Sequence, residues 1–180
     1  MKRTEFHTRE NVKIRAWDKD GNPIKLFKRN ELLHRLFGLN VGHFVNELNM
    51  ANMVVNGGLV ALGTAAFDSG DSTKFTYIAV GSGNTAADAT DTALETELTA
   101  NGMARAAGTY SQTTTSVAND TKVISHTFTA SGASATIAET GVFSAASAGT
   151  MMNRFVLPSA ITISDGSSIQ ITHEFQVARS

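Results

Sequence analysis

The segment Ile169-Gln-Ile-Thr-His-Glu-Phe-Gln-Val177 alternates strictly, which places Ile169, Ile171, His173, Phe175 and Val177 on one face. Such a period of two predicts a half-buried β-strand. The segment Thr121-Lys-Val-Ile-Ser-His-Thr-Phe-Thr-Ala130 repeats the pattern, with Ile124, His126 and Phe128 on one face. The C-terminal part of the chain is therefore expected to be mainly β.

Further short apolar segments extend this expectation to residues 71–180, which we predict to form one β-sandwich or jelly-roll-like domain. The candidate strands are 75–81, 102–110, 122–130, 135–143, 150–157 and 168–178, with a short extra one at 161–163. Turn signals separate them at Asn101-Gly102, Asn119-Asp120, Ser131-Gly132, Ala148-Gly149 and Ser164-Asp-Gly-Ser167. Residues 82–100 are expected to form a long loop, with one helical turn at 93–98. The expected core includes Tyr77, Val80, Ile137, Val142, Phe155, Ile169, Ile171 and Phe175.

Residues 1–30 are predicted to form a basic β-hairpin arm. Val12, Ile14 and Ala16 alternate with polar residues and Trp17, which gives the first strand an apolar face. The turn formers of Asp18-Lys-Asp-Gly-Asn-Pro23 follow, with Gly21 available for a positive φ. Ile24-Lys-Leu-Phe27 then returns as the second strand.

Residues 31–70 are predicted to form a mostly helical connector. Asn30 is an N-cap for a short helix, Glu31 to Phe37, and Gly38 is its C-cap. Leu32, Leu33, Leu36 and Phe37 form an apolar stripe on this helix, which could cover an apolar surface. Residues 44–55 are apolar with helical or mixed spacing and are rich in Asn and Met. They favour core packing, with an inter-subunit contact as the alternative.

The charge distribution indicates a docking arm. Residues 1–40 hold ten Lys or Arg and five Asp or Glu, so their net charge is +5, whereas the remaining 140 residues carry −6. A basic arm ahead of an acidic body predicts attachment to an acidic surface; an ordinary solvated hairpin is the alternative. The predicted partner-binding residues are Lys13, Arg15, Trp17, Ile24, Lys25, Phe27 and Lys28. Acids are interspersed among these bases, so specific nucleic-acid binding is not expected.

Several other classes of protein are not expected. The chain of 180 residues has no Cys, which excludes disulfides and thiolate metal sites. No run approaches the roughly 18 apolar residues that span a bilayer, and the N-terminus lacks the apolar core of a signal peptide. We therefore expect no membrane contact and synthesis in a cytoplasm.

No catalytic, cofactor or metal site is predicted. Gly81-Ser-Gly83-Asn-Thr-Ala86 matches a dinucleotide fingerprint nominally, but no helix or βαβ alternation follows, so the glycines are expected to allow a tight turn and close backbone approach. The five histidines are far apart, although His126 and His173 could meet across strands. One loop contains four acidic residues: Asp88, Asp91, Glu95 and Glu97. They could form a cation site, an acidic rim or an acceptor for the arm.

Four segments resemble a recurrent module of tailed-bacteriophage structural proteins. That module has a strand ending "ALGTGTT" that leads to "DTAL", and later strands that read "ITEAGLF" and "GTMLAR". Here the matching segments are Tyr77-Ile-Ala-Val-Gly-Ser-Gly-Asn-Thr85, Asp91-Thr-Ala-Leu94, Ile137-Ala-Glu-Thr-Gly-Val-Phe143 and Gly149-Thr-Met-Met-Asn-Arg154. The resemblance covers about residues 75–178 and, loosely, the arm.

The resemblance implies a non-enzymatic virion component that is assembled in the host bacterial cytoplasm. Its first implied role is a capsid decoration or cement protein, which binds the major capsid protein or other virion proteins as a homo-oligomer, with a trimer favoured. The alternative virion role is that of a tail-fibre, collar or baseplate protein. The enzymatic alternative is a small β-domain hydrolase. In either virion role, residues 1–29 are expected to be dispensable for folding but needed for attachment.

Overall fold

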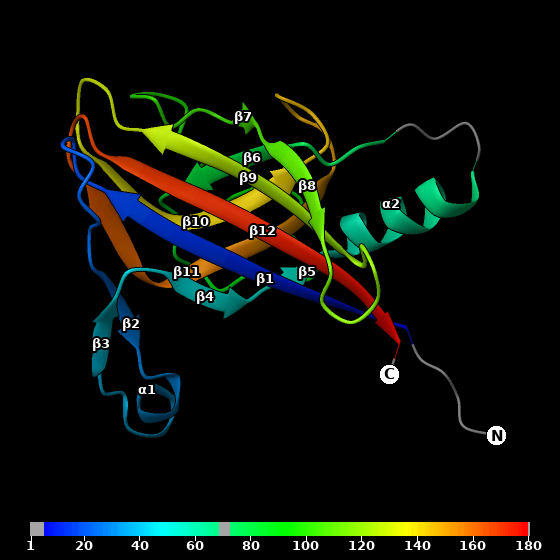
Figure 1. Ribbon diagram of the computed structural model, residues 1–180, viewed down its shortest axis with the longest axis horizontal. Helices are drawn as coiled ribbons and strands as arrows, with labels where there is room; N and C mark the ends of the chain where they lie inside the picture. Colours follow the sequence, from blue (N-terminus) through cyan, green and yellow to red (C-terminus); the bar gives the residue numbers. More distant parts are fainter. Residues whose placement is uncertain (1–5, 69–72, 180) are drawn as a thin grey trace.

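Two five-stranded antiparallel sheets pack face to face in the computed structural model, which describes residues 6–68 and 73–179 (Figure 1). The first sheet has the order β4 (Leu48–Ala51), β1 (Phe6–Trp17), β12 (Ser168–Arg179), β9 (Thr121–Thr129) and β8 (Thr109–Thr113). The second has the order β5 (Met53–Val54), β11 (Met151–Ile163), β10 (Ala135–Phe143), β6 (Tyr77–Gly81) and β7 (Ala106–Ala107). The expected mainly β fold is confirmed; its jelly-roll connectivity stays a prediction.

Strand β1 is a central strand of the first sheet, so the predicted hairpin arm is wrong. β1 pairs antiparallel with β12 along its length, from Phe6 opposite Arg179 to Trp17 opposite Ser168. Its other edge pairs with β4. The apolar face was predicted correctly, because Val12, Ile14 and Ala16 are buried in the core between the sheets. The hairpin prediction failed because periodicity shows which face is buried but does not show which strand lies alongside. Lys2 and Arg3 lie outside the described residues.

The division into arm, connector and sandwich is corrected by the same observation, because the sandwich extends from β1 to β12. Helix α1 (Glu31–Phe37) forms as predicted, with the Asn30 side chain accepting from the Leu33 amide and Gly38 in the left-handed conformation. Residues 44–55 are not helical; they contribute to β3 (Gly42–Val45), β4 and β5. The second helix, α2 (Asn56–Phe67), follows instead. Strand pairing with β1 and β11 outweighs the weak helical spacing of this segment.

The strand and turn predictions for the C-terminal part are largely confirmed. Positive φ occurs at each predicted turn, at Gly21, Asn101, Gly102, Asn119, Gly132, Ala148, Gly149 and Gly166. Six of the eight expected core residues are buried between the sheets. Phe175 is half-buried against that core, and Tyr77 packs on a second, smaller cluster with Leu94 and Phe143. Residues 82–100 form the predicted loop, without a helical turn.

We predict that deleting residues 1–17 abolishes cooperative unfolding, because it removes the strand between β4 and β12. A milder test is Ile14→Ala, which truncates a fully buried side chain and should lower the free energy of unfolding by about 2–5 kcal/mol. Urea denaturation followed by circular dichroism measures both effects. A deletion variant that unfolds with the midpoint of the full chain would contradict the central place of β1.

Candidate partner-binding site

The four segments that carry the resemblance meet at one buried ion-pair network on the outer face of the second sheet. Glu139 on β10 is fully buried, and its carboxylate accepts from the Gly83, Glu95 and Thr96 amides at 3.2, 3.1 and 2.8 Å. The Nε atom of Arg154 on β11 donates to the same carboxylate at 2.7 Å. This network binds the 82–100 loop to the sheet.

Arg154 extends the network to the acidic residues of the loop. Its guanidinium lies 2.9 Å from Asp91 and 3.4 Å from Glu95, and it also donates to the Thr85 carbonyl. A second arginine, Arg105, pairs with Glu97 at 2.7 Å. These three loop carboxylates therefore serve as acceptors for arginines of the sandwich, a role that was not among the three alternatives taken from the sequence.

The two glycines of the nominal dinucleotide motif make room for Glu139. A Cβ atom at Gly81 or Gly83 would lie only 2.5 or 2.6 Å from the Glu139 carboxylate. At Gly141, a Cβ would meet the Asn153 carbonyl at 2.7 Å. Close backbone approach, the reading preferred from the sequence, is thus the role of Gly81 and Gly83.

A second polar chain crosses the core and links the two sheets. Asn153 on β11 donates from its Nδ2 atom to Glu10 on β1 and to the Nδ1 atom of His173 on β12, the latter at 2.8 Å. The Thr140 hydroxyl donates to the Ala79 carbonyl, so the contact between Nε2 of His173 and Thr140 at 3.2 Å is a bond that the imidazole donates. The chain therefore requires a neutral His173.

Burial perturbs both titratable members of this chain. Desolvation lowers the pKa of His173 to about 3. Desolvation also raises the pKa of Glu10 well above its usual value, against the opposing effect of the Asn153 hydrogen bond, and Oε2 of Glu10 is buried without a partner in the described chain. His126 does not join: its Nδ1 atom bonds the Ala107 carbonyl. No group of three or more potential metal ligands occurs among residues 6–68 and 73–179.

Six of the eleven exposed large apolar residues of the described chain lie on a projection that we call the lobe, residues 26–45. It consists of β2 (Leu26–Arg29), α1 and β3, and it stands away from the sandwich (Figure 1). Leu26 and Val45 anchor its base in the core. At the other end, α1 buries none of its residues. Six large apolar side chains of the lobe are exposed: Leu32, Leu36, Phe37, Leu39, Val41 and Phe44.

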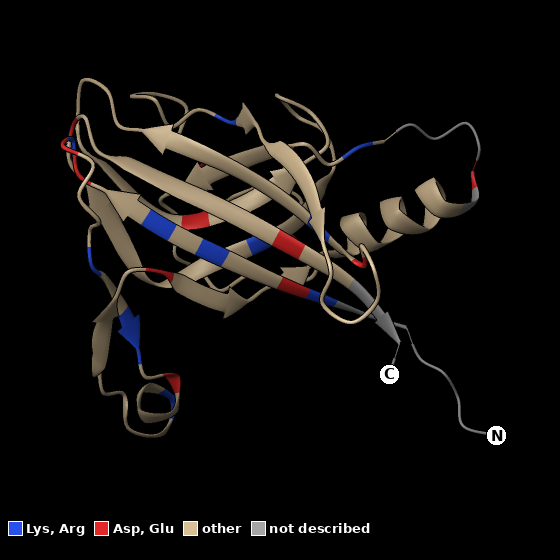
Figure 2. Ribbon diagram, in the orientation of Figure 1, with Lys and Arg blue, Asp and Glu red and all other residues tan. Residues whose placement is uncertain are grey.

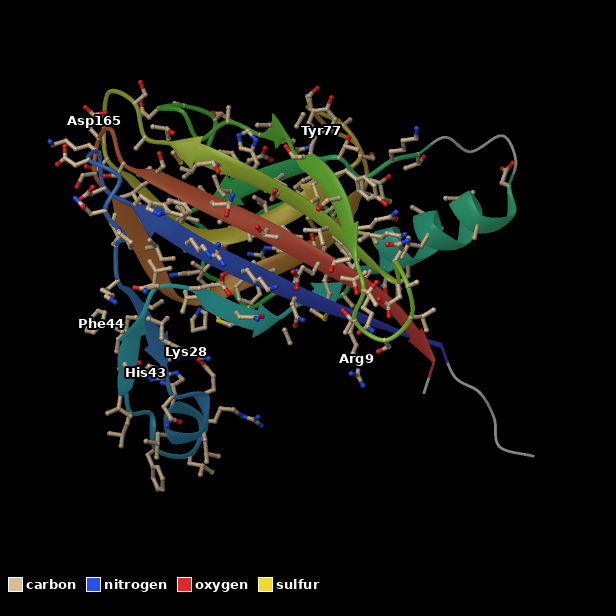
Figure 3. The ribbon with its side chains drawn as sticks, in the orientation of Figure 1. Arg9, Lys28, His43, Phe44, Tyr77 and Asp165 are labelled. Carbon is tan, nitrogen blue, oxygen red and sulfur yellow. The ribbon has the colours of Figure 1, made fainter. Side chains whose placement is uncertain are left out.

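Local packing holds the lobe in shape without covering these side chains. The rings of Phe27 and Phe44 meet edge to face with centroids 5.6 Å apart, and Figure 3 shows Phe44, His43 and Lys28 on the lobe. Gly42 allows the two strands to approach, because a Cβ there would overlap the Lys28 carbonyl. An open groove of about 910 Å³ separates the lobe from the 82–87 loop, with Arg29 and Asn84 among its lining residues.

The structure places four of the seven predicted partner-binding residues in or beside the lobe. Phe27 and Lys28 belong to β2, and Ile24 and Lys25 precede it, with Ile24 packed partly against the core and Lys25 bonded to Asn46. The other three lie on β1. Lys13 and Arg15 form ion pairs with Glu174 and Glu47, and Trp17 is half-buried beside Pro23. Figure 2 shows these basic residues of β1 and the lobe as separate groups.

The sequence reasoning missed the exposed apolar residues as a partner surface. The stripe of Leu32, Leu36 and Phe37 was identified as able to cover an apolar surface, but its residues were not among the predicted partner-binding residues. Only the structure shows that α1 has no such surface beneath it.

The comparisons with known proteins identify no relative. No protein-family model, no curated protein and no solved structure matches this chain. Within residues 6–68 and 73–179, neither helix combines the length and apolar character required to cross a membrane.

We predict that Glu139→Ala lowers the free energy of unfolding by about 3–5 kcal/mol, because it leaves the buried Arg154 side chain and three amides without their acceptor. The matched control is Glu47→Ala, which breaks the pair with Arg15, whose side chain is 55% exposed, and should cost about 1 kcal/mol or less. Chemical denaturation measures both, and hydrogen exchange should rise across residues 82–97 only in Glu139→Ala. Equal losses in the two variants would contradict this role.

We also predict that His173 makes the protein sensitive to acid. Its pKa is about 3 in the folded chain and about 6.5 when unfolded, so the unfolded state binds the proton first as the pH falls. The stability that depends on neutral His173 is fully present above pH 6.5 and is lost as the pH falls toward 3, by an amount on the order of 5 kcal/mol.

Glu10 has the opposite effect on stability. Because its pKa is raised in the folded chain, Glu10 stabilises the fold at pH values below its unfolded pKa, and this stabilisation is lost as the pH rises through its folded pKa. Unfolding of the wild type and of His173→Gln should therefore be compared at each pH, since Glu10 is common to both. The difference between them should shrink from pH 6.5 downward. A constant difference would show that His173 does not titrate in this way, and Glu10→Gln isolates the opposing contribution.

Proposed function

We propose that this protein is a non-enzymatic structural component of a tailed-bacteriophage virion, a capsid decoration or cement protein that binds the head lattice through the lobe. The observation that carries the proposal is the exposed apolar surface of the lobe. Leu32, Phe37 and Phe44 are 66, 66 and 67% exposed, although such side chains are ordinarily buried. Clustered exposed apolar residues mark protein–protein interfaces.

The build of the lobe supports a docking role. It contains a two-stranded sheet, and a two-stranded sheet is only marginally stable in water without further packing. Its exposed Lys28 and Arg35 outnumber its single acid, Glu31, so it suits an acidic surface that has apolar hollows. A single lobe is a small contact surface, so one subunit is expected to bind with modest affinity. Many copies on a lattice bind more tightly through avidity when they are joined to one another.

The loop network supports the resemblance on which the virion assignment rests. Four segments that are separate in the sequence, and that were matched separately to the phage module, meet at Glu139 and Arg154. Residues from all four matched segments thus belong to one network of hydrogen bonds and ion pairs. This gives the resemblance a physical basis, because the same glycine, acid and arginine positions would be needed wherever the loop is held in this way.

The test compares particles made without this protein before and after its addition. We expect the wild type to restore density on the head surface in electron micrographs and to co-sediment with heads. Leu36→Asp places a charge on an exposed lobe position and should weaken binding at least about tenfold without affecting folding. Val117→Asp, a substitution at another exposed apolar residue outside the lobe, is the matched control and should bind normally.

One result would contradict the decoration role, and another would contradict the role of the lobe. Particles without the protein that keep their head surface but lack a tail part would favour the tail-fibre, collar or baseplate alternative. Equal binding by Leu36→Asp and the wild type would exclude the lobe as the attachment surface.

A further inference from the structure

Glu10 places a carboxyl group in the core with no cation beside it. The residue lies on the inner face of β1, and only 5% of its surface is exposed. None of the ion pairs in the described part of the chain includes Glu10. The neighbouring bases of β1 lie on its outer face: Lys13 pairs with Glu174, and Figure 3 shows Arg9 directed away from the sandwich. An ionised Glu10 would be unfavourable here, because burial of an unpaired charge costs much free energy.

The hydrogen bonds around Glu10 leave it a single donor. Asn153 has two amide hydrogens, and it gives one to Glu10 and the other to His173. The Oδ1 atom of Asn153 accepts from the Val142 amide at 2.8 Å, so the side-chain amide cannot turn over. The second carboxyl oxygen of Glu10, Oε2, is buried without a partner in the described chain. One neutral donor compensates an un-ionised carboxyl group far better than a carboxylate.

A second buried atom without a partner lies on the neighbouring segment of chain. Asn52, between β4 and β5, donates its backbone amide to the Glu10 carbonyl at 2.9 Å. The Nδ2 atom of Asn52 is buried and has no partner among the described residues. The same residue lines the open groove beside the lobe. An unused acceptor on Glu10 and an unused donor on Asn52 thus occur on adjoining residues, and the donor borders the solvent.

No other charge faces Glu10 from the described elements that pack against it. Strand β12 presents His173, which desolvation keeps uncharged by lowering its pKa to about 3. Strand β11 presents the uncharged Asn153, whereas Arg154 is directed to the other face of the sheet. The link between β4 and β5 presents the uncharged Asn52. The state of this cluster at neutral and alkaline pH therefore depends on whether Glu10 carries its proton.

We propose that Glu10 is a protonation-dependent latch: its un-ionised carboxyl group joins β1 to β11 through Asn153, and its carboxylate turns out of the core to the Asn52 side chain at the groove. In the outer position the carboxylate gains a donor and contact with water, so its charge is no longer desolvated. The contact with Asn153 between the sheets is then lost. Desolvation raises the pKa of Glu10 against the opposing effect of the Asn153 hydrogen bond, so the latch is closed at low pH and opens as the pH rises. The latch does not depend on the virion assignment.

Opening of the latch should affect β5 first. This strand is two residues long, and it pairs with β11 only at Asn153 and Arg154. When Glu10 leaves Asn153, this short pairing loses the contact that fixes its partner strand to β1. Residues 51–54 should therefore open locally while the long pairing of β1 with β12 remains.

Infrared spectroscopy tests the protonation state. At neutral pH the wild type should show the carbonyl stretch of a buried carboxylic acid, and this band should be missing in Glu10→Gln, which keeps the size of the side chain without its proton. Raising the pH should remove the band from the wild type. Glu10→Met, which keeps the volume, is the second variant if Glu10→Gln does not fold. A wild type without the band at neutral pH, or a variant that retains it, would overturn the proposal.

Hydrogen exchange tests the opening. At a pH at which the band has disappeared, amides 51–54 should exchange at least about tenfold faster in the wild type than in Glu10→Gln, and at neutral pH the two should agree. Comparison at one pH cancels the base catalysis of exchange. Asn52→Ala removes the outer donor but keeps the backbone bond, so it should shift the loss of the band to higher pH; Glu47→Gln is the control and should not. Equal exchange in wild type and Glu10→Gln at alkaline pH would refute the latch, and an unshifted band in Asn52→Ala would refute its outer position.

Discussion

The buried pair of Glu139 and Arg154 is the interaction on which the arrangement of the second sheet depends. Alternation along β10 directs Thr140 and Val142 into the space between the sheets and Glu139 to the other face. That outer face would be a solvated surface in a simple sandwich. Here the carboxylate holds three loop amides, so the loop covers the sheet and Leu94 packs beside Phe143 and Ala79. Strand β10 is consequently buried on both faces, and a buried charge is tolerated because every donor around it is matched.

Local signals predicted the features that depend on nearby residues. The turn glycines, the cap residues Asn30 and Gly38, and the alternating faces of β1, β9 and β12 are determined within a few positions of sequence. Local signals could not predict that β1 pairs with β12. The two strands are separated by almost the whole chain, and any apolar strand edge would satisfy the same pattern. The segment 44–55 was misjudged for the same reason, because its strands exist only beside β1 and β11.

The candidate sites show the same limit. Glu139 and Arg154 were noticed as letters of a motif, yet their role required the knowledge that residues 83, 95 and 96 approach one carboxylate. The basic residues of the supposed arm were identified by charge alone, whereas the structure assigns Lys13 and Arg15 to ion pairs on the sheet. The apolar lobe could be suspected from the stripe on α1, but exposure is a property of what surrounds a helix and cannot be read from the helix itself.

The pairing of the first strand with the last has a consequence for how the protein is made. β12 lies between β1 and β9, so three of the five strands of the first sheet cannot take their final neighbours until residue 179 has been synthesised. Until then, strand β1 can pair with β4 at one edge, but its other edge has no partner. Contacts of such sequence separation form slowly, so chaperones can bind the open edge of β1 before β12 does.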